Sequence, residues 1–358
     1  MKNSVLQDCL RNGAALEEIK EKYAIDIKPH PRFPYLFLFK YDMIESPMAE
    51  PLVQECRGII LDSLDNWNIV CRAFNKFHNY GEELAAMIDW GTAKVQEKLD
   101  GSLMQMFYFA GEWRVASSGT PDAGGNVNGF DFTFAELFWR VWNEMGYKTD
   151  QLTKGWTYAF ELMTPYNKIV VQHKGNSLVL IGARNLADNH EHYVGDIPIN
   201  VRKVQTHDLK DINQILLALP DLDPLKSEGY IVVDGDFRRV KIKSPKYVAL
   251  HRVKGSWSFK NMVEIVRTGE ISEVVNAFPE YADDLTKTKA KFDELVLRLE
   301  TLYQQHKHLE SQKDFALAIK GLPMYSALFS LRKGEFDSVR EWMAHSRLES
   351  LVDVLLGD

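Results

Sequence analysis

The sequence is poor in cysteine and lacks the spacings that cysteine sites need. Its 358 residues include three cysteines, Cys9, Cys56 and Cys71, which lie far apart and form no C-x-x-C pair. Disulfide frameworks use even numbers of cysteines, and zinc sites usually draw on closely spaced pairs. We therefore expect reduced thiols, and we exclude a disulfide scaffold and a cysteine zinc site.

Long apolar runs are absent as well. No stretch reaches the roughly 18 apolar residues that a membrane-spanning helix requires, and the first residues contain no apolar core typical of a signal peptide. We expect no membrane contact and a cytoplasmic location.

The chain also has no overall excess of positive charge. It contains 43 Lys and Arg residues against 50 Asp and Glu residues, a formal net charge of −7. A uniformly basic surface that coats nucleic acid is therefore excluded. The charge is uneven, because residues 237–260 carry eight basic residues and no acidic one, +8 against −15 for the remainder.

We call these 24 residues the basic strip. Aromatic residues and a histidine are interleaved with its cations, namely Tyr247, His251, Trp257 and Phe259. Such a mixture is suited to holding phosphates and stacking unpaired bases. For Tyr247 we expect a core position instead. The basic residues are Arg238, Arg239, Lys241, Lys243, Lys246, Arg252, Lys254 and Lys260.

The order of the patterns predicts two domains. From Pro31 to about Pro245, short β-branched and aromatic runs alternate with turn residues, interrupted by helical patterns at 133–145 and 208–219. This indicates an α+β domain with antiparallel sheets over residues 1–254.

Beyond Gly255 a helical periodicity takes over. Apolar residues recur on one helix face, and further helical pieces are expected at 314–319, 324–332 and 336–356. We predict an all-helical domain over 255–358, with that face packed inside the domain rather than in a coiled coil. The periodic residues are Leu285, Phe292, Leu295, Leu299 and Leu302.

The sharpest local feature is the polar turn Glu97-Lys98-Leu99-Asp100-Gly101-Ser102 between two strand-like runs. A lysine in such a turn is usually just solvated. Downstream, however, stand Glu161, Glu228-Gly229 and Lys241-Ile242-Lys243, whose two lysines share one strand face. Each could be an ordinary strand residue; together they suit nucleotidyl transfer.

Nucleotidyl transfer needs an unprotonated amine to attack phosphorus, and nearby cations favour that form of an amine. Lys241, Lys243 and Arg57 are suitable cations, which can also hold a triphosphate. Glu228 and Asp100 can hold a divalent metal through oxygen or water.

In this order the motifs resemble the covalent nucleotidyltransferases, which comprise ATP-dependent RNA and DNA ligases and mRNA capping enzymes. Lys98-Leu99-Asp100-Gly101 matches their K-x-D-G motif. The resemblance implies an ATP-grasp-like adenylyltransferase fold, a covalent Lys98–AMP adduct, and Mg²⁺ or Mn²⁺ as the metal. It also implies that Arg57 engages phosphates, Glu161 reads the ribose, Glu97 belongs to the nucleotide site, Asp100 and Glu228 serve the metal, and Lys241 and Lys243 contact the α-phosphate.

Within that group the chain looks similar to the phage RNA ligase 1 family over about residues 50–255. Phe74 to Glu82 resembles its F-x-K-F-x-N-x-G-E element, which implies that Lys76 and Phe77 lie near the ATP phosphates. The implied partner is single-stranded RNA or a broken tRNA loop, for RNA or tRNA repair in a host cytoplasm. We expect a monomer without a protein partner.

One departure concerns Ser118, which stands where family members often carry a basic residue. The runner-up functions are a DNA ligase or a capping enzyme, and a catalytically silent RNA-binding relative. The predicted helices after the lysine pair, in place of a β-barrel module, argue against the first two. The third is disfavoured because RNA binding alone does not need a reactive lysine beside two carboxylates. The motif residues for the chemistry are all present, namely Lys98, Glu161, Glu228, Lys241 and Lys243.

Two weaker patterns favour structural explanations. Residues 124–129 could be a phosphate loop, but they lack the Lys-Ser or Lys-Thr ending and predict a surface loop. His190 and His192 could suggest a metal site, but they lie in a segment rich in turn formers.

Overall fold

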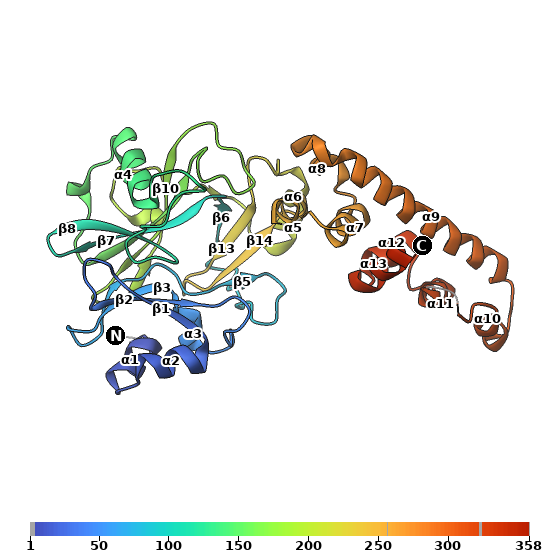
Figure 1. Cartoon of the computed structure of the whole chain (residues 1–358), viewed down its shortest axis with the longest axis horizontal. Coiled ribbons are helices and arrows are strands. Elements are labelled where there is room, and N and C mark those ends of the chain that lie inside the picture. Colours follow the sequence, from blue (N-terminus) through green and yellow to red (C-terminus); the bar gives the residue numbers. More distant parts are fainter. Residues whose placement is uncertain (1–3, 256, 322–323, 358) are drawn as a thin grey trace. The chain divides into compact units, whose positions relative to one another are not determined.

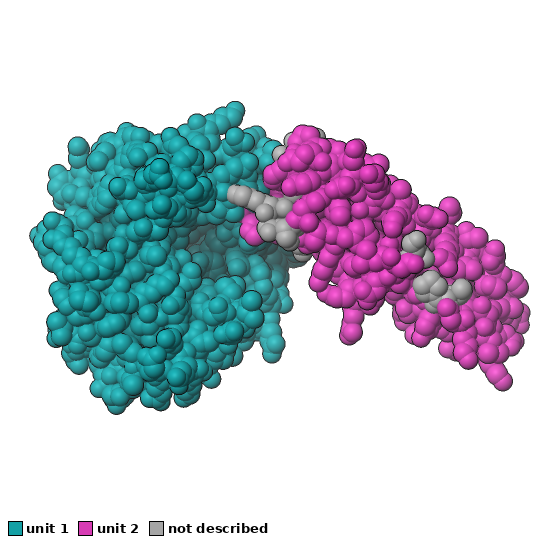
Figure 2. Space-filling model, in the orientation of Figure 1, with its two compact units in different colours: residues 1–244 teal, residues 245–358 magenta. Residues whose placement is uncertain are grey.

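The computed structural model describes residues 4–255, 257–321 and 324–357. It divides into two compact units, Met1–Ser244 and Pro245–Asp358, which Figure 2 colours separately. The first unit contains the strands, and the second is built from helices (Figure 1). This confirms the predicted α+β class with antiparallel sheets followed by a helical region.

The units divide before Pro245, whereas we expected the boundary between residues 254 and 255. Helix α6 (Pro245–Gly255) accounts for the difference, because it packs against α7 (Phe259–Thr268) and α8 (Ile271–Ala277). That the units act as an adenylyltransferase domain and a separate helical domain stays a prediction.

The first sheet has four antiparallel strands in the order β1-β2-β3-β4. Its strands are β1 (Ile25–Pro29), β2 (Leu36–Tyr41), β3 (Arg57–Asp62) and β4 (Asn68–Cys71). Three helices lie against it, α1 (Val5–Arg11), α2 (Leu16–Tyr23) and α3 (Pro51–Glu55) (Figure 1). They share a buried core with β2 and β3, so this sheet presents Arg57 from a firmly packed base.

The second sheet has the order β11-β10-β9-β7-β8. Its strands are β7 (Ser102–Phe109), β8 (Glu112–Ser117), β9 (Trp156–Met163), β10 (Ser177–Asn185) and β11 (His190–His192). Helix α4 (Phe134–Glu144) covers it and buries Leu137, Phe138 and Trp142 (Figure 1). Thr133 and Glu136 form a capping box, which explains why the helix begins where the sequence predicted.

The third sheet has the order β12-β6-β13-β14-β5, with β5 parallel to β14. Its strands are β5 (His78–Asn79), β6 (Lys94–Lys98), β12 (Thr206–His207), β13 (Gly229–Val233) and β14 (Arg239–Lys243). The apolar face packs on α5 (Ile212–Ala218). This helix begins later than predicted, because Asp211 is its N-cap. The opposite face carries the lysines.

The helical unit contains α6, α7 and α8, and the further helices α9 (Ala282–His306), α10 (Gln312–Ala318), α11 (Tyr325–Lys333), α12 (Val339–His345) and α13 (Leu348–Gly357). Helix α9 buries the predicted apolar face within the unit, against α7, α12 and α13. The single helix expected at 336–356 is wrong, because the extended backbone of Ser346 separates α12 from α13.

Short 3-10 turns complete the two units, at Thr149–Gln151, Val194–Asp196, Leu219–Asp221 and Pro279–Tyr281. Within the described part of the chain, no helix is both long and apolar enough to cross a membrane.

Candidate active site

The turn that carries Lys98 joins the third sheet to the second. Lys98 ends β6, and β7 begins at Ser102. Gly101 allows the turn to approach β9, because a Cβ at this position would lie 2.5 Å from the carbonyl oxygen of Leu162. The glycine of K-x-D-G therefore brings Lys98 towards Glu161, which precedes Leu162 on β9.

Glu228 lies where three strands of the third sheet meet. Its backbone N–H donates to the carbonyl of Lys98 (3.3 Å), and its carbonyl accepts from the N–H of Ser244 (2.9 Å). A Cβ at Gly229 would lie 2.1 Å from the carbonyl oxygen of Ile242. The Glu-Gly pair therefore fixes a carboxylate at the ends of β6 and β14.

The Glu228 carboxylate bridges two amines. Lys98 Nζ lies 2.5 Å from Oε2, and Lys243 Nζ lies 2.7 Å from Oε1. Glu228 is 5% exposed, whereas the side chains of Lys98 and Lys243 are 19% and 28% exposed. The counter-charge is thus buried, while both lysine side chains stay partly exposed.

Lys241 is the neighbouring amine on the same face of β14. The register pairs Ile231 with Lys241 and Gly229 with Lys243, which confirms the prediction that both lysines share one face. Burial lowers the pKa of Lys241 to about 8, and the positive charges of Lys76 and Lys243 add to that effect. These amines therefore form a site of concentrated positive charge.

Further cations lie near Lys241, namely Arg57 and Lys76, and the ring of Phe77 lies beside Arg57. The Arg57 guanidinium lies 4.5 Å from the centre of the Phe77 ring, and Arg57 Nη1 donates to the Asn75 carbonyl (3.4 Å). Burial, and then the charge of Arg57, lower the pKa of Lys76. Residues from β3 and from the segment before β5 thus extend the positive region.

Glu161 lies within electrostatic reach of the same cluster. The residue as a whole is half-buried, and loss of hydration raises the pKa of its carboxyl to about 7. Lys98 lowers that pKa, whereas Glu228 raises it. A carboxyl that is half protonated near neutral pH can both donate and accept a hydrogen bond to a hydroxyl group.

One oxygen of the Asp100 carboxylate is held by the backbone. Its Oδ2 accepts hydrogen bonds from the N–H groups of Val170 (2.9 Å) and Val171 (2.6 Å), and the side chain is buried. A metal at Oδ2 would have to displace these donors. The predicted metal contact of Asp100 therefore competes with a structural task.

Glu228 is the second carboxylate predicted to serve a divalent metal, and both of its oxygens contact amines. Among the described residues, no group of three histidine, cysteine or carboxylate side chains could hold a metal. Magnesium is often held by one or two carboxylates together with substrate phosphates, so a single carboxylate among phosphate-binding cations suffices.

The side chain of Glu97 is not brought to the lysine cluster. Glu97 pairs with Tyr230, and strand alternation puts both on the apolar face of the sheet, opposite Lys98.

Next to Ser118, cations approach from other strands. Lys40 Nζ lies 3.2 Å from where a Cβ of Gly119 would stand, and Lys28 donates to the Gly119 carbonyl (3.1 Å).

Three cations of the basic strip form ion pairs, and that the strip holds phosphates and stacks bases stays a prediction. Arg239 pairs with Glu191, Arg238 with Asp234, and Lys260 with Glu349, so these charges are neutralised locally. The strip also runs from β14 into the helical unit, and the side chains of Arg252 and Lys254 lie outside the described residues.

Two aromatic residues of the basic strip, Tyr247 and Trp257, take part in packing contacts. Tyr247 is buried, as expected. The Trp257 ring stacks on Tyr281 at 3.9 Å, and its Nε1 donates to Asp284 (2.8 Å). Trp257 is therefore engaged within its own unit.

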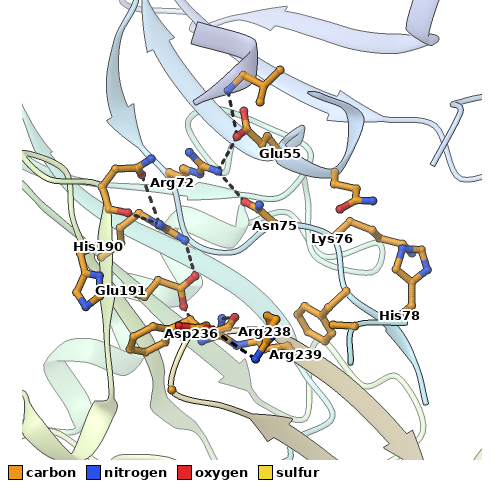
Figure 3. Close-up of a pocket in the computed structure, with 18 of the residues that line it drawn as sticks. Glu55, Arg72, Asn75, Lys76, His78, His190, Glu191, Asp236, Arg238 and Arg239 are labelled. Atoms are coloured by element: carbon orange, nitrogen blue, oxygen red, sulfur yellow. Dashed lines mark hydrogen bonds and ion pairs between the residues drawn. The ribbon is translucent and has the colours of Figure 1, made fainter. Parts of the chain in front are cut away.

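A cavity of about 1180 Å³ lies at the Arg239 end of β14 (Figure 3). Lys76 and His78 line one side, and a network of arginines and glutamates lines the other. Glu191 pairs with Arg239 (2.6 Å) and with Arg184, and Glu55 pairs with Arg72 (3.1 Å). These ion pairs are almost completely buried.

The comparison that decides the family covers the residues of this site. A family model described as RNA ligase matches residues 55–247, more than half of the chain. The chain belongs to the RNA ligase family. The match includes Arg57, Lys98 and Glu228, and it ends just after the lysine pair of β14.

Two relatives of similar sequence are described as RNA ligases. An RNA ligase of Rhodothermus phage RM378 is 25% identical, covering 86% of this chain and 87% of that protein. RNA ligase 1 of bacteriophage TS2126 is 28% identical, covering 52% of this chain and 49% of that protein. Among solved structures, an archaeal ATP-dependent RNA ligase has a TM-score of 0.48 at 13% identity, covering 85% and 82% of the two chains.

Several residues that order the site were not assigned from the sequence. Asn167 Nδ2 donates to Ser102 Oγ (2.9 Å) and to the Leu162 carbonyl (2.7 Å). The buried Gln105 donates to the Gly58 carbonyl (2.8 Å) and accepts from the Ala73 N–H (2.9 Å). An isolated amide inside an apolar strand, such as Gln105 in β7, is the signal that could have identified it.

Proposed function

We propose that this protein is an ATP-dependent RNA ligase that joins 5′-phosphate and 3′-hydroxyl RNA ends through a covalent Lys98–AMP adduct. The observation that carries the proposal is the Glu228 bridge between Lys98 and Lys243, inside the segment matched by the RNA ligase family. It holds one amine as a nucleophile beside a second that can bind the phosphate under attack.

Adenylylation comes first. The unprotonated Lys98 amine attacks the α-phosphorus of ATP, a P–N bond forms, and the P–O bond to pyrophosphate breaks. Glu228 Oε2, 2.5 Å from the amine, is placed to accept the proton that Lys98 loses. Lys241, Lys243, Lys76 and Arg57 offset the charge on the phosphates and on the departing pyrophosphate.

Two transfers follow. A 5′-phosphate oxygen of RNA attacks the Lys98-bound phosphorus and breaks the P–N bond, which returns the amine. A 3′-hydroxyl then attacks the 5′-phosphate and expels AMP. Glu161, with its pKa near neutral, is suited to bind the ribose hydroxyls of the nucleotide.

A divalent metal, Mg²⁺ or Mn²⁺, would be held by Glu228 and by phosphate oxygens. When bound, it supplies positive charge that polarises the phosphate under attack. Asp100 would join through Oδ2 only if that oxygen gave up the two backbone donors of residues 170 and 171.

A labelling experiment tests the proposal. Incubation with radiolabelled ATP and Mg²⁺ should label the protein covalently, and Lys98→Ala should abolish the label. Lys94→Ala is the matched control, because Lys94 lies on the same face of β6 but its Nζ stands over the Tyr193 ring at 3.7 Å. Wild-type labelling of Lys98→Ala would refute the mechanism.

Substrate comparison separates the alternatives. Labelling with GTP instead of ATP would favour a capping enzyme, and sealing of nicked duplex DNA in preference to RNA would favour a DNA ligase. RNA binding without any labelling would favour a silent relative.

The remaining expectations are also part of the proposal. We propose single-stranded RNA or a broken tRNA loop as substrate, a monomer as the active form, and a cytoplasmic setting consistent with three unpaired cysteines.

Removal of the residues after about 256 should preserve labelling and impair sealing of a structured RNA more than of an oligonucleotide. Equal losses on both substrates would contradict a selective role for the helices.

A further inference from the structure

Three aromatic rings of the first unit form a cluster that the proposed chemistry does not use. Phe130 and Phe132 stack at 5.3 Å with an interplanar angle of 20°, and the Tyr166 ring meets them edge-on at 5.2 and 5.4 Å. We call these three residues the aromatic platform. Phe130 stays 43% exposed despite its two aromatic neighbours.

A tight turn presents Phe130. Asn128 and Gly129 have φ values of +41° and +84°, the left-handed conformation that an Asn-Gly pair adopts readily. The Phe130 N–H donates to the Val127 carbonyl (2.8 Å), and the Val127 N–H donates to the Phe132 carbonyl (3.0 Å). The surface loop predicted here is therefore a built turn that holds a large ring at the surface.

Hydrogen bonds connect the platform to the turn that carries Lys98. Asn128 Nδ2 donates to the Tyr166 carbonyl (3.0 Å), and the following residue, Asn167, donates to Ser102 Oγ (2.9 Å). A few residues later the backbone N–H groups of 170 and 171 hold Asp100. The platform and the nucleophile thus belong to one connected assembly.

The chemistry of the platform favours a nucleobase. The Arg140 guanidinium lies over the Phe132 ring at 4.8 Å, and unpaired bases stack on aromatic and guanidinium planes. Asp131, exposed between the two phenylalanines, would repel a phosphate. Stacking on a ring needs no net positive charge, whereas binding of the RNA backbone does. The aromatic platform therefore suits the flat face of a base better than it suits the RNA backbone.

We infer that the aromatic platform stacks one unpaired base of the RNA substrate close to the ends being joined. This inference rests on the proposed RNA ligase function. It assigns Phe130 the main contact with the base, because Phe130 is the most exposed ring of the three.

The test compares Phe130→Leu with Phe130→Trp. Leucine keeps the apolar character and removes the π face, whereas tryptophan keeps stacking. With a pre-adenylylated donor oligonucleotide, Phe130→Leu should raise the KM for RNA about tenfold with little change in kcat, and Phe130→Trp should remain near wild type. Labelling by ATP without RNA should be equal in all three proteins.

Abasic oligonucleotides sharpen the test. One abasic position near the joined ends should weaken wild-type binding about as much as Phe130→Leu does, and Phe130→Leu should be insensitive to it. An unchanged KM for Phe130→Leu, or an equal loss with every abasic oligonucleotide, would overturn the inference. So would a change in oligomeric state without a change in KM, which would identify a protein contact instead.

The two proposals fail separately. If Lys98 is never labelled, the ligase proposal fails. If labelling is normal and Phe130→Leu joins RNA like wild type, only the platform fails. Thermal unfolding of Phe130→Leu should match wild type, because the residue lies on a surface turn. If this variant unfolds at a lower temperature, the KM values of Phe130→Trp are measured with the abasic oligonucleotides instead. If no abasic position then changes the KM of Phe130→Trp, the inference is overturned.

Discussion

Two carboxylates of the first unit each bridge two cations, and the two bridges differ in the type of the cations and in their exposure. Glu228 holds Lys98 and Lys243, whose side chains are 19% and 28% exposed. Glu191 holds Arg184 and Arg239, whose side chains are 8% and 9% exposed (Figure 3). Lys243 and Arg239 even lie on the same face of the same strand, β14.

The difference shows how one charge pattern serves two tasks. Lysine is a compact, flexible cation that can lose its proton, whereas the planar guanidinium of arginine stays charged and suits buried ion pairs. The partly exposed lysine bridge can therefore exchange its carboxylate for a phosphate. The buried arginine bridge joins β10, β11 and β14 and holds them beside the cavity.

The largest effect should come from breaking the lysine bridge with Glu228→Gln. The variant loses the counter-charge that orients Lys98 and the carboxylate that would hold a metal. We expect the labelling rate to fall by about 10²- to 10³-fold, the range for removal of one electrostatic group from an active site. Single-turnover labelling with ATP measures it.

Thermal unfolding provides the control for Glu228→Gln. Both lysines keep access to water, so the variant should stay folded at assay temperature. A labelling rate within a few-fold of wild type would show that the Glu228 bridge is not part of the chemistry.

Breaking the arginine bridge should affect stability instead. Glu191→Gln leaves two buried guanidiniums without their shared counter-charge, and removing one partner of a buried ion pair costs about 3–5 kcal/mol. We expect the free energy of unfolding to fall by about that amount in urea titrations. The labelling rate per folded molecule should change little.

Glu112→Gln is the matched control for Glu191→Gln. Glu112 also pairs with two arginines, Arg32 and Arg114, but its side chain is 60% exposed. Removing it should change stability by no more than about 1 kcal/mol. Equal losses for both variants would contradict the distinction between the buried and the exposed pairs.

The smallest effect is the contribution of Lys241 to the pH dependence of ATP binding. Lys241 has a pKa of about 8 and is charged below that pH. Bound polyphosphate favours the protonated amine, so ATP affinity should fall as the pH rises through 8, by at most about tenfold per pH unit. Arg184, with a pKa of about 10, stays charged at pH 9.

The variant Lys241→Arg tests whether the pH dependence of ATP affinity comes from Lys241. Arginine keeps its charge, so the ATP dissociation constant of this variant should vary less between pH 7 and 9 than that of wild type. A wild-type affinity that is constant over this range would show that Lys241 does not titrate against the nucleotide.

The fold was predictable where local patterns suffice. The capping box at Thr133 and the apolar face of α4 specify that helix within a dozen residues. Helices α1 and α2 and the break at Ser346 were missed, because they depend on what packs against them. Helix α1 begins where Ser4 and two backbone N–H groups bind Glu55, about 50 residues away in the chain.

The site divides in the same way. Strand alternation predicted that Lys241 and Lys243 share a face, and the same rule places Glu97 on the apolar face, away from Lys98. Alternation could not show that Asp100 binds the backbone of residues 170 and 171, or that Arg239 pairs with Glu191. Those contacts join distant segments, and sequence spacing does not encode them.

The sequence by itself determined the residue types that nucleotidyl transfer requires, their order, and the helical character of the last hundred or so residues. Those features follow from side-chain chemistry and from periods of 2 and 3.6 residues, which are local. Only the tertiary structure decided which charges are neutralised in the interior and which amines stay accessible beside a carboxylate. Burial depends on the whole fold, because water must be excluded from all sides before a charge is held in place.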